Sequence, residues 1–339
     1  GISAWEISRE VRRLVALGEV EGEDPVARAI SRSIVALGDP LGLSARELSR
    51  WSDGLDIPGS GNPQLLTGHM YQLMPYVIGL SKLRRRAGSS SMRVGARITS
   101  VYPRLFSLSH AFVDRSLRAR YDGYLRKIAL LLSAAGIRFS YDPREPYPGT
   151  LLYELGYDDE FAAYAGRFAA YLRSRQVSKV ITVDPHTWEL LRDIYPRYVE
   201  GFEDEFEVLH YSELLGGLSL RALPRTVAYH EPCHFVVRDD QLRAPAKLLG
   251  DAASEVVYAR CSGRRNHCCG GPAELLRGDL AEEVSLRRRG ELRDAGGEVI
   301  VTACPICNAN LANGGGDRVV DLAELLAEAT GMRDPNATG

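Results

Sequence analysis

The first 232 residues of this 339-residue chain contain no cysteine, although the whole chain has six. Lysine is also scarce, since only four of the 42 basic residues are lysine. The net charge is −2, which argues against a nucleic-acid partner bound by bulk electrostatics. No apolar stretch approaches the ~20 residues that span a bilayer, and the longest, residues 128–132, lies in an amphipathic helical pattern.

The start of the chain lacks a secretory signal, because it is polar and acidic rather than basic and then apolar. It begins at Gly1 without a methionine, which leaves room for an upstream segment. We expect a cytoplasmic protein that reaches a membrane, if at all, through a partner. In that compartment clustered cysteines indicate metal binding or catalysis before disulfide bonds.

The pattern along the chain predicts an α/β fold. Helical periodicity and a serine cap predict a small helical lead-in over residues 1–60, closed by a Pro/Gly-rich turn at 58–63. Strands and helices then alternate, which predicts parallel sheets covered by helices. The predicted strands are residues 64–67, 137–141, 179–183, 207–210, 226–229, 255–258, 298–301 and 319–320, and the predicted helices include residues 111–134, 273–294 and 305–312.

Five cysteines form one spaced set near the C-terminus, namely Cys233, Cys268, Cys269, Cys304 and Cys307. Each group follows a predicted strand, and ligands collect at the C-terminal ends of parallel strands. Thiolates select zinc, copper(I) or iron–sulfur clusters. Four thiolates complete a zinc site or an ordinary cluster, so the fifth favours a multinuclear iron–sulfur centre with a bridging thiolate. Cys261 lies outside the set, and we expect it to be a buried free cysteine.

The two halves of the chain repeat one pattern, and the copy in the first half lacks the cysteines. Residues 147–149 match 268–270, residues 184–187 match 304–307, and His69 matches Cys233. We therefore expect two pseudo-repeated Rossmann-like domains, over residues 61–215 and 216–332. The remnant set is a vestigial pocket, a docking surface or, by default, plain structure, and His69 and His186 are its candidate metal or substrate ligands. It consists of His69, Tyr147, Asp184 and His186.

The spacing C-x34-C-C-G-x33-C-x2-C resembles that of the CCG, or cysteine-rich, domain of heterodisulfide reductase subunits and related iron–sulfur oxidoreductases. The phrases YHEPCH at 229–234, CCGGP at 268–272 and VTACPIC at 301–307 carry the resemblance, which extends over about residues 64–326. Residues 38–51 resemble the helical lead-in of long family members.

This resemblance implies an oxidoreductase subunit that carries one non-cubane [4Fe-4S] cluster on the five cysteines and transfers electrons for disulfide/thiol or related chemistry. It also implies ferredoxin-like and flavoprotein partner subunits. Two departures qualify it: the first copy lacks thiols for a second cluster, and no upstream ferredoxin-like segment with two cysteine quartets is present. Electrons would therefore have to enter or leave through a partner, and the sequence identifies neither donor, acceptor nor catalytic residue.

Polar residues around the cysteines are candidates for supporting roles. Arg264, Arg265 and His267 precede Cys268 and could offset cluster charge or hold an anionic substrate; the alternative is a solvated loop. His230 and His234 are candidate hydrogen-bond donors or proton carriers, or else structural histidines.

Three other interpretations compete. Residues 230–234 match the H-E-x-x-H metalloprotease signature, but Pro232 and the preceding strand exclude the helix that it needs. A thioredoxin-type pair at Cys304 and Cys307 leaves the other three cysteines unused. A zinc-binding, non-catalytic assembly subunit remains the alternative to the iron–sulfur protein, because zinc needs only four of the five ligands.

Overall fold

Seven short strands form two parallel sheets in the computed structural model, which describes residues 4–22, 24–87, 113–236, 242–271, 277–313 and 315–332. The first sheet has the order β1-β2-β3 and the second the order β5-β4-β6-β7, and every pairing is parallel. The strands are β1 (Gln64–Leu66), β2 (Lys179–Thr182), β3 (Glu207–His210), β4 (Leu223–Tyr229), β5 (Ala253–Val257), β6 (Val299–Thr302) and β7 (Val319–Asp321). The predicted α/β class is confirmed.

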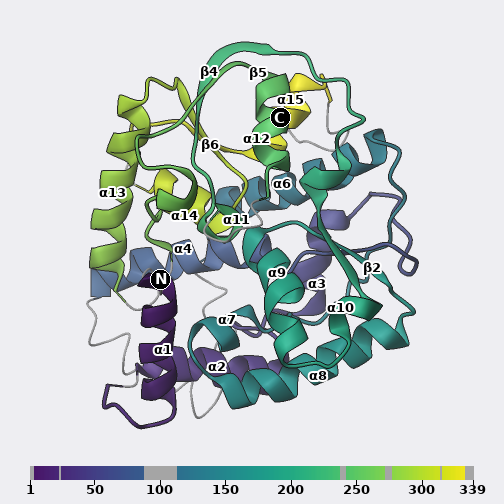
Figure 1. Cartoon of the computed structure of the whole chain (residues 1–339), viewed down its shortest axis with the longest axis vertical. Coiled ribbons are helices and arrows are strands. Elements are labelled where there is room, and N and C mark those ends of the chain that lie inside the picture. The colour runs from purple at the N-terminus through teal and green to yellow at the C-terminus, as the bar shows by residue number, and fades with distance from the viewer. Residues whose placement is uncertain are drawn as a thin grey trace.

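Helices separate and cover the two sheets (Figure 1). The long helices α4 and α6 cross the middle of the view and contact α14 and α15 of the second half. The α-helices are α1 (Ala4–Ala16), α2 (Pro25–Leu37), α3 (Ala45–Ser49), α4 (Met70–Ala87), α6 (Arg115–Ala134), α7 (Thr150–Glu154), α8 (Asp158–Ser174), α9 (Pro185–Glu189), α10 (Phe202–Glu205), α11 (Cys233–Val236), α12 (Ala244–Ala252), α13 (Gly278–Asp294), α14 (Pro305–Ala312) and α15 (Leu322–Ala329). Shorter turns are η1 (Arg50–Ser52), η3 (Leu190–Ile194), η4 (Tyr195–Arg197), η5 (Tyr211–Leu214) and η6 (Gly263–Arg265).

The core is shared by the two halves of the chain. The larger cluster of buried apolar side chains includes Leu65 and Val180 from the first sheet together with Val227 and Val301 from the second. A smaller cluster surrounds the thiols of Cys269, Cys304 and Cys307. The predicted domain boundaries after residues 60 and 215 stay a prediction. Within the described residues, no helix combines the length and the apolarity that crossing a membrane requires.

One predicted strand is wrong. Residues 137–141 contribute only an isolated parallel bridge between Ser140 and Gln64. The Ser140 carbonyl accepts from the Leu65 amide of β1, and the Ser140 amide donates to the Pro63 carbonyl. The Tyr141 amide instead donates to the Pro58 carbonyl in the turn before β1, so the pairing with β1 does not extend along the segment. The predicted helices over 111–134 and 273–294 are described from Arg115 and Gly278, and their first residues at 111–112 and 273–276 lie outside the described part.

The predicted helical lead-in is present, and its third helix begins at the predicted serine cap. The Asp24 carboxylate accepts from the Val26 amide at the start of α2, and Ser44 and Glu47 form a capping box on α3. Helix α1 lies against α7, where the Arg12 guanidinium donates to the Glu154 carbonyl at 2.6 Å. Gly156 makes this approach possible, because a Cβ there would lie 2.4 Å from the Arg13 amide nitrogen.

Gly156→Ala should destabilise the protein and detach α1. Its φ of +87° is costly for alanine, about 1–3 kcal/mol, and the added methyl would overlap the backbone of α1. Urea unfolding would measure the loss. Gly166→Ala is the matched control, since Gly166 lies exposed inside α8 with open space around it and alanine there should stabilise by up to about 1 kcal/mol. Equal stability of the two variants would contradict the packing of α1 on Gly156.

Candidate metal centre

The three cysteine-bearing loops meet beside the C-terminal ends of β4 and β6, which are neighbours in the second sheet. Cys233 begins α11 after β4, and Cys268 and Cys269 lie in the loop before α13. Cys304 caps α14 after β6, with Cys307 in the first turn. The backbone amide of His230 donates to the Val301 carbonyl at 2.9 Å and so holds the first and third loops together.

Cys269 is the acceptor at the centre of the group. Hydrogen bonds from the thiols of Cys268 and Cys307 lower its pKa well below the ordinary value, burial opposes this shift, and His230 adds to it. The donor atoms of His230, Cys269 and Cys307 all lie within 4.8 Å of one another. The surrounding hydrogen-bond donors therefore favour the deprotonated form of Cys269.

Cys304 is a second thiolate position. Burial raises its pKa, but hydrogen bonds from Cys307 and His186 outweigh burial and lower the pKa to about 5. Its sulfur also accepts from the backbone amide of Cys307 at 3.5 Å, because it caps the N-terminus of α14. Each of the two thiolates is thus paired with a histidine, one from each half of the chain.

Cys233 and Cys268 complete the group. Burial, followed by the charge of Cys269, raises the pKa of Cys233 to about 12, and the nearby charge of Cys304 adds to the shift. The Cys268 sulfur accepts from the Gly270 amide at 3.3 Å. Cys261 stands apart and is partly rather than fully buried. The five cysteines of the predicted set, without Cys261, therefore gather in one place, and such a donor set fits a sulfur-ligated metal or cluster.

His230 is held in place by Arg288, a side chain that the sequence did not single out. The Arg288 Nε donates to His230 Nδ1 at 3.1 Å, so the opposite ring nitrogen of His230 carries the hydrogen that Cys269 accepts. Arg288 is 1% exposed and also donates to Glu291 at 2.9 Å. His267 bonds the same carboxylate at 2.7 Å. This chain of contacts supports the predicted hydrogen-bonding role of His230 and connects it to His267.

The other predicted supporting residues lie farther from the thiols. Arg264 and Arg265 are exposed on η6, as expected for a solvated loop. His234 turns its Nδ1 to the Glu189 carboxylate and stacks near the ring of His186, at 3.9 Å between ring centroids. Pro272, part of the quoted CCGGP phrase, lies outside the described residues.

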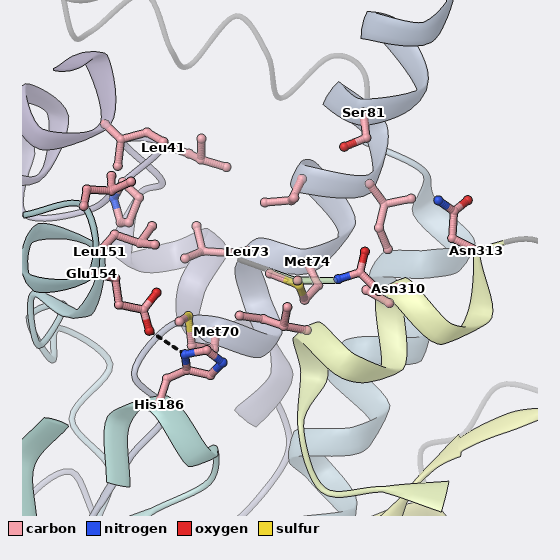
Figure 2. Close-up of a pocket in the computed structure, with 18 of the residues that line it drawn as sticks. Leu41, Met70, Leu73, Met74, Ser81, Leu151, Glu154, His186, Asn310 and Asn313 are labelled. Atoms are coloured by element: carbon pink, nitrogen blue, oxygen red, sulfur yellow. Dashed lines mark hydrogen bonds and ion pairs between the residues drawn. The ribbon is translucent and has the colours of Figure 1, made fainter. Parts of the chain in front are cut away.

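A mainly apolar pocket lies between the first helices of the chain and α14 (Figure 2). Helices α4 and α14 form much of its wall, and the hydrogen-bonded pair His186 and Glu154 lies at one end. Gly271 lines the pocket as well, and a Cβ at this position would lie 3.4 Å from the Cys269 sulfur and 2.4 Å from Ile306. Only glycine fits between the pocket and the thiols.

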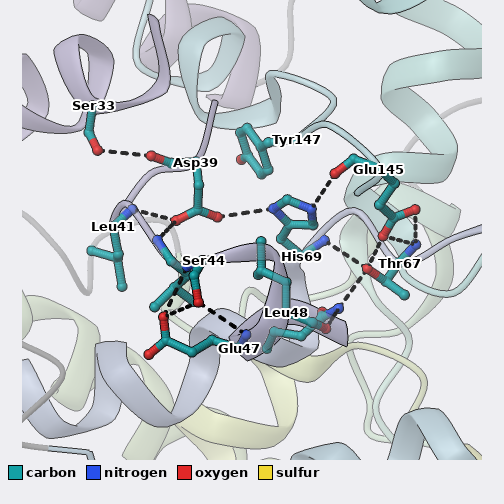
Figure 3. A network of polar contacts seen from close by, with 12 residues as sticks. Ser33, Asp39, Leu41, Ser44, Glu47, Leu48, Thr67, His69, Glu145 and Tyr147 are labelled. Carbon is teal, nitrogen blue, oxygen red and sulfur yellow. Dashed lines mark hydrogen bonds and ion pairs between the residues drawn. The ribbon is translucent and has the colours of Figure 1, made fainter. Parts of the chain in front are cut away.

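In the remnant set of the first half, His69 lies in a network of hydrogen bonds (Figure 3). His69 Nδ1 donates to the Asp39 carboxylate at 3.0 Å and Nε2 to the Glu145 carbonyl at 3.2 Å. Burial opposes protonation, yet Asp39 raises the pKa of His69. Both ring nitrogens are therefore engaged, which argues against His69 as a metal ligand and favours the structural alternative.

Some backbone features of the two halves correspond. Gly149 and Gly270 both adopt a left-handed conformation, with φ of +90° and +88°. Asp184 caps α9 as Cys304 caps α14. These matches agree with the proposed internal repeat, which stays a prediction.

Residues 227–312 match the family model of the cysteine-rich domain named CCG. The match contains all five cysteines of the spaced set, and the resemblance inferred from their spacing is confirmed.

The chain is similar to several redox proteins. It is 25% identical to the probable iron-sulfur-binding oxidoreductase FadF of Bacillus subtilis, over 94% of this chain and 43% of that protein. It is 27% identical to one component of the dihydromethanophenazine:CoB–CoM heterodisulfide reductase of Methanosarcina barkeri, over 60% of this chain and 54% of that protein. It is 26% identical to the EtfAB:quinone oxidoreductase of Syntrophomonas wolfei, over 62% of this chain and 32% of that protein. The chain therefore spans about a third to just over half of these relatives' lengths.

Proposed function

We propose that this chain is an iron–sulfur electron-transfer subunit of a heterodisulfide-reductase-like redox complex. The observation that carries the proposal is the gathering of five thiols from three loops in one buried group. The relatives support the same class of function, because they include an iron-sulfur-binding oxidoreductase and a heterodisulfide reductase component.

The finer proposal is a five-cysteine, non-cubane [4Fe-4S] cluster held by Cys233, Cys268, Cys269, Cys304 and Cys307. Adjacent Cys268 and Cys269 favour it, because a single zinc ion uses four ligands and leaves one thiol over. When bound, such a cluster accepts and donates single electrons.

The protein's own groups would stabilise negative charge on the sulfurs. The amides of Gly270 and Cys307 donate to two of them, at 3.3 and 3.5 Å, and His230 and His186 donate to the two thiolates. Hydrogen bonds of this kind make sulfur less electron-rich and raise the reduction potential of a bound cluster. The apolar pocket beside Gly271 keeps this face poor in water and offers a place for an electron acceptor.

The acceptor that we propose is a disulfide or a related two-electron acceptor. Reduction of a disulfide consumes two electrons and two protons and yields two thiols, and the electrons would come from a ferredoxin-like or flavoprotein partner subunit. These partners and the cytoplasmic location stay predictions.

Metal analysis of the anaerobically purified chain tests the proposal. We expect about four iron and four acid-labile sulfide per chain, with a visible absorption band that bleaches on reduction. Stoichiometric zinc without iron or sulfide would overturn the proposal in favour of the zinc-binding assembly subunit. Subunits that co-purify would show which electron circuit the chain serves.

A further inference from the structure

Two buried histidines and one partly buried glutamate outside the cysteine set converge at the boundary between the two halves. They are Glu154 at the end of α7, His186 in α9 and His234 in α11, and their donor atoms lie within 4.8 Å of one another. Glu154 Oε1 lies 2.7 Å from His186 Nδ1 and 3.8 Å from His234 Nε2. The proposed cluster does not require these three side chains to lie close together.

We propose that Glu154, His186 and His234 bind a divalent transition-metal ion, such as zinc or ferrous iron. Two imidazoles and one carboxylate are a common donor set for these ions. With metal–ligand bonds of about 2.0–2.1 Å and tetrahedral angles, the donors would stand roughly 3.3 Å apart. The observed 2.7 and 3.8 Å separations from Glu154 Oε1 lie on either side of that value, so shifts of about half an ångström would bring these two pairs to it, and the donor atoms of the two histidines lie within 4.8 Å of each other.

Glu189 contacts His234 at the ring nitrogen that faces away from Glu154. Its carboxylate bonds His234 Nδ1, which turns Nε2 toward Glu154. Histidines that bind metals usually have their second ring nitrogen held by such a carboxylate. A bound ion would replace the proton that His186 Nδ1 shares with Glu154, and the carboxylates of Glu154 and Glu189 would then balance the charge of a divalent ion among mostly buried groups.

The position of the site gives the ion an open side. Glu154 and His186 both line the apolar pocket, as Figure 2 shows, so a water molecule or a pocket ligand can fill a fourth position. Three protein ligands with one free position are typical of catalytic rather than structural metal sites. His186 also bonds Cys304, so one imidazole would join this ion to the thiol group. The proposal does not depend on the cluster, because none of its three ligands is a cysteine.

The test uses cobalt(II) as a probe on the full chain, purified anaerobically and treated with EDTA. We expect wild type to bind one cobalt ion with visible ligand-field bands but without the near-ultraviolet sulfur-to-cobalt charge-transfer band. Glu154→Gln should lose this binding while iron, sulfide and the circular dichroism spectrum stay unchanged. Glu189→Gln should weaken it roughly 10- to 100-fold.

Glu205→Gln is the control, because Glu205 lies on the surface in an ion pair with Arg173 and should leave cobalt binding unchanged. Three outcomes would overturn the proposal: no cobalt bound by wild type, equal binding by Glu154→Gln, or a charge-transfer band that Cys307→Ser removes. The last outcome would place the ion on the thiols. A chain without iron that still shows the expected cobalt behaviour would reject the cluster and retain this site.

Discussion

Cys269→Ser removes most of the iron and sulfide from the protein, if the five thiols hold a cluster. The Cys269 sulfur has the most contacts with its neighbours in the group, since it accepts from Cys268, Cys307 and His230. Serine is a hard oxygen donor with a high pKa and a shorter side chain, so it would replace a thiolate poorly. Iron and sulfide analysis, the visible spectrum and a redox titration would measure the effect.

Cys261→Ser provides the matched control for this prediction. Cys261 lies outside the thiol group, and the contact that ties it to the network uses its backbone carbonyl, which serine retains. Its metal content and potential should equal those of wild type. A Cys269→Ser protein with the spectrum and potential of wild type would show that Cys269 is not a ligand.

Arg288→Met should lower the free energy of unfolding by about 3–5 kcal/mol, the cost of breaking a buried ionic network by removing one partner. The Arg288 side chain is 1% exposed, and it donates to the Cys261 carbonyl at 2.8 Å and to Asn266 Oδ1 at 2.7 Å. Methionine fills part of the space but leaves these acceptors and His230 Nδ1 without their donor. Anaerobic urea unfolding would measure the loss.

Arg287→Met separates this network from a general effect of losing an arginine. The Arg287 side chain is 77% exposed, and its ion pair with Glu291 spans 3.6 Å. Its removal should change stability by less than about 1 kcal/mol. If the two methionine variants unfold at the same urea concentration, the buried network does not contribute as proposed. A shift in potential in Arg288→Met alone would further indicate that His230 is positioned through Arg288.

The sequence predicted those parts of the fold that depend on local signals. Helix α14 begins at Pro305 and ends at Ala312 as predicted, because a proline suits the first position of a helix. The cysteine spacing likewise identified the thiol group, since the cysteines follow successive parallel strands. Residues 137–141 failed as a strand because the Tyr141 amide donates to Pro58, in a turn distant in sequence, and the pairing with β1 does not extend along the segment.

The missed residues act through contacts between distant segments. Arg288 contacts His230, which is 58 positions away in the sequence, and Glu189 contacts His234, which is 45 positions away. Three arginines follow one another at Arg287–Arg289, and the sequence does not show that the central one is buried. Helix α13 has only a weak hydrophobic periodicity, so its buried face cannot be recognised from the pattern. Glu154 ends a short helix and resembles any surface glutamate in the sequence. Only the folded chain brings it to His186 and His234.

The packing at Gly271 sets how near an incoming molecule can come to the sulfurs. Backbone without a side chain lies between the pocket and Cys269, and the space that a β-carbon would need is already taken by Ile306. Electron tunnelling slows steeply with each added ångström between donor and acceptor. The bare backbone here therefore offers a short tunnelling route, and a side chain at this position would both lengthen that route and push against Ile306, which lies between Cys304 and Cys307 in the sequence.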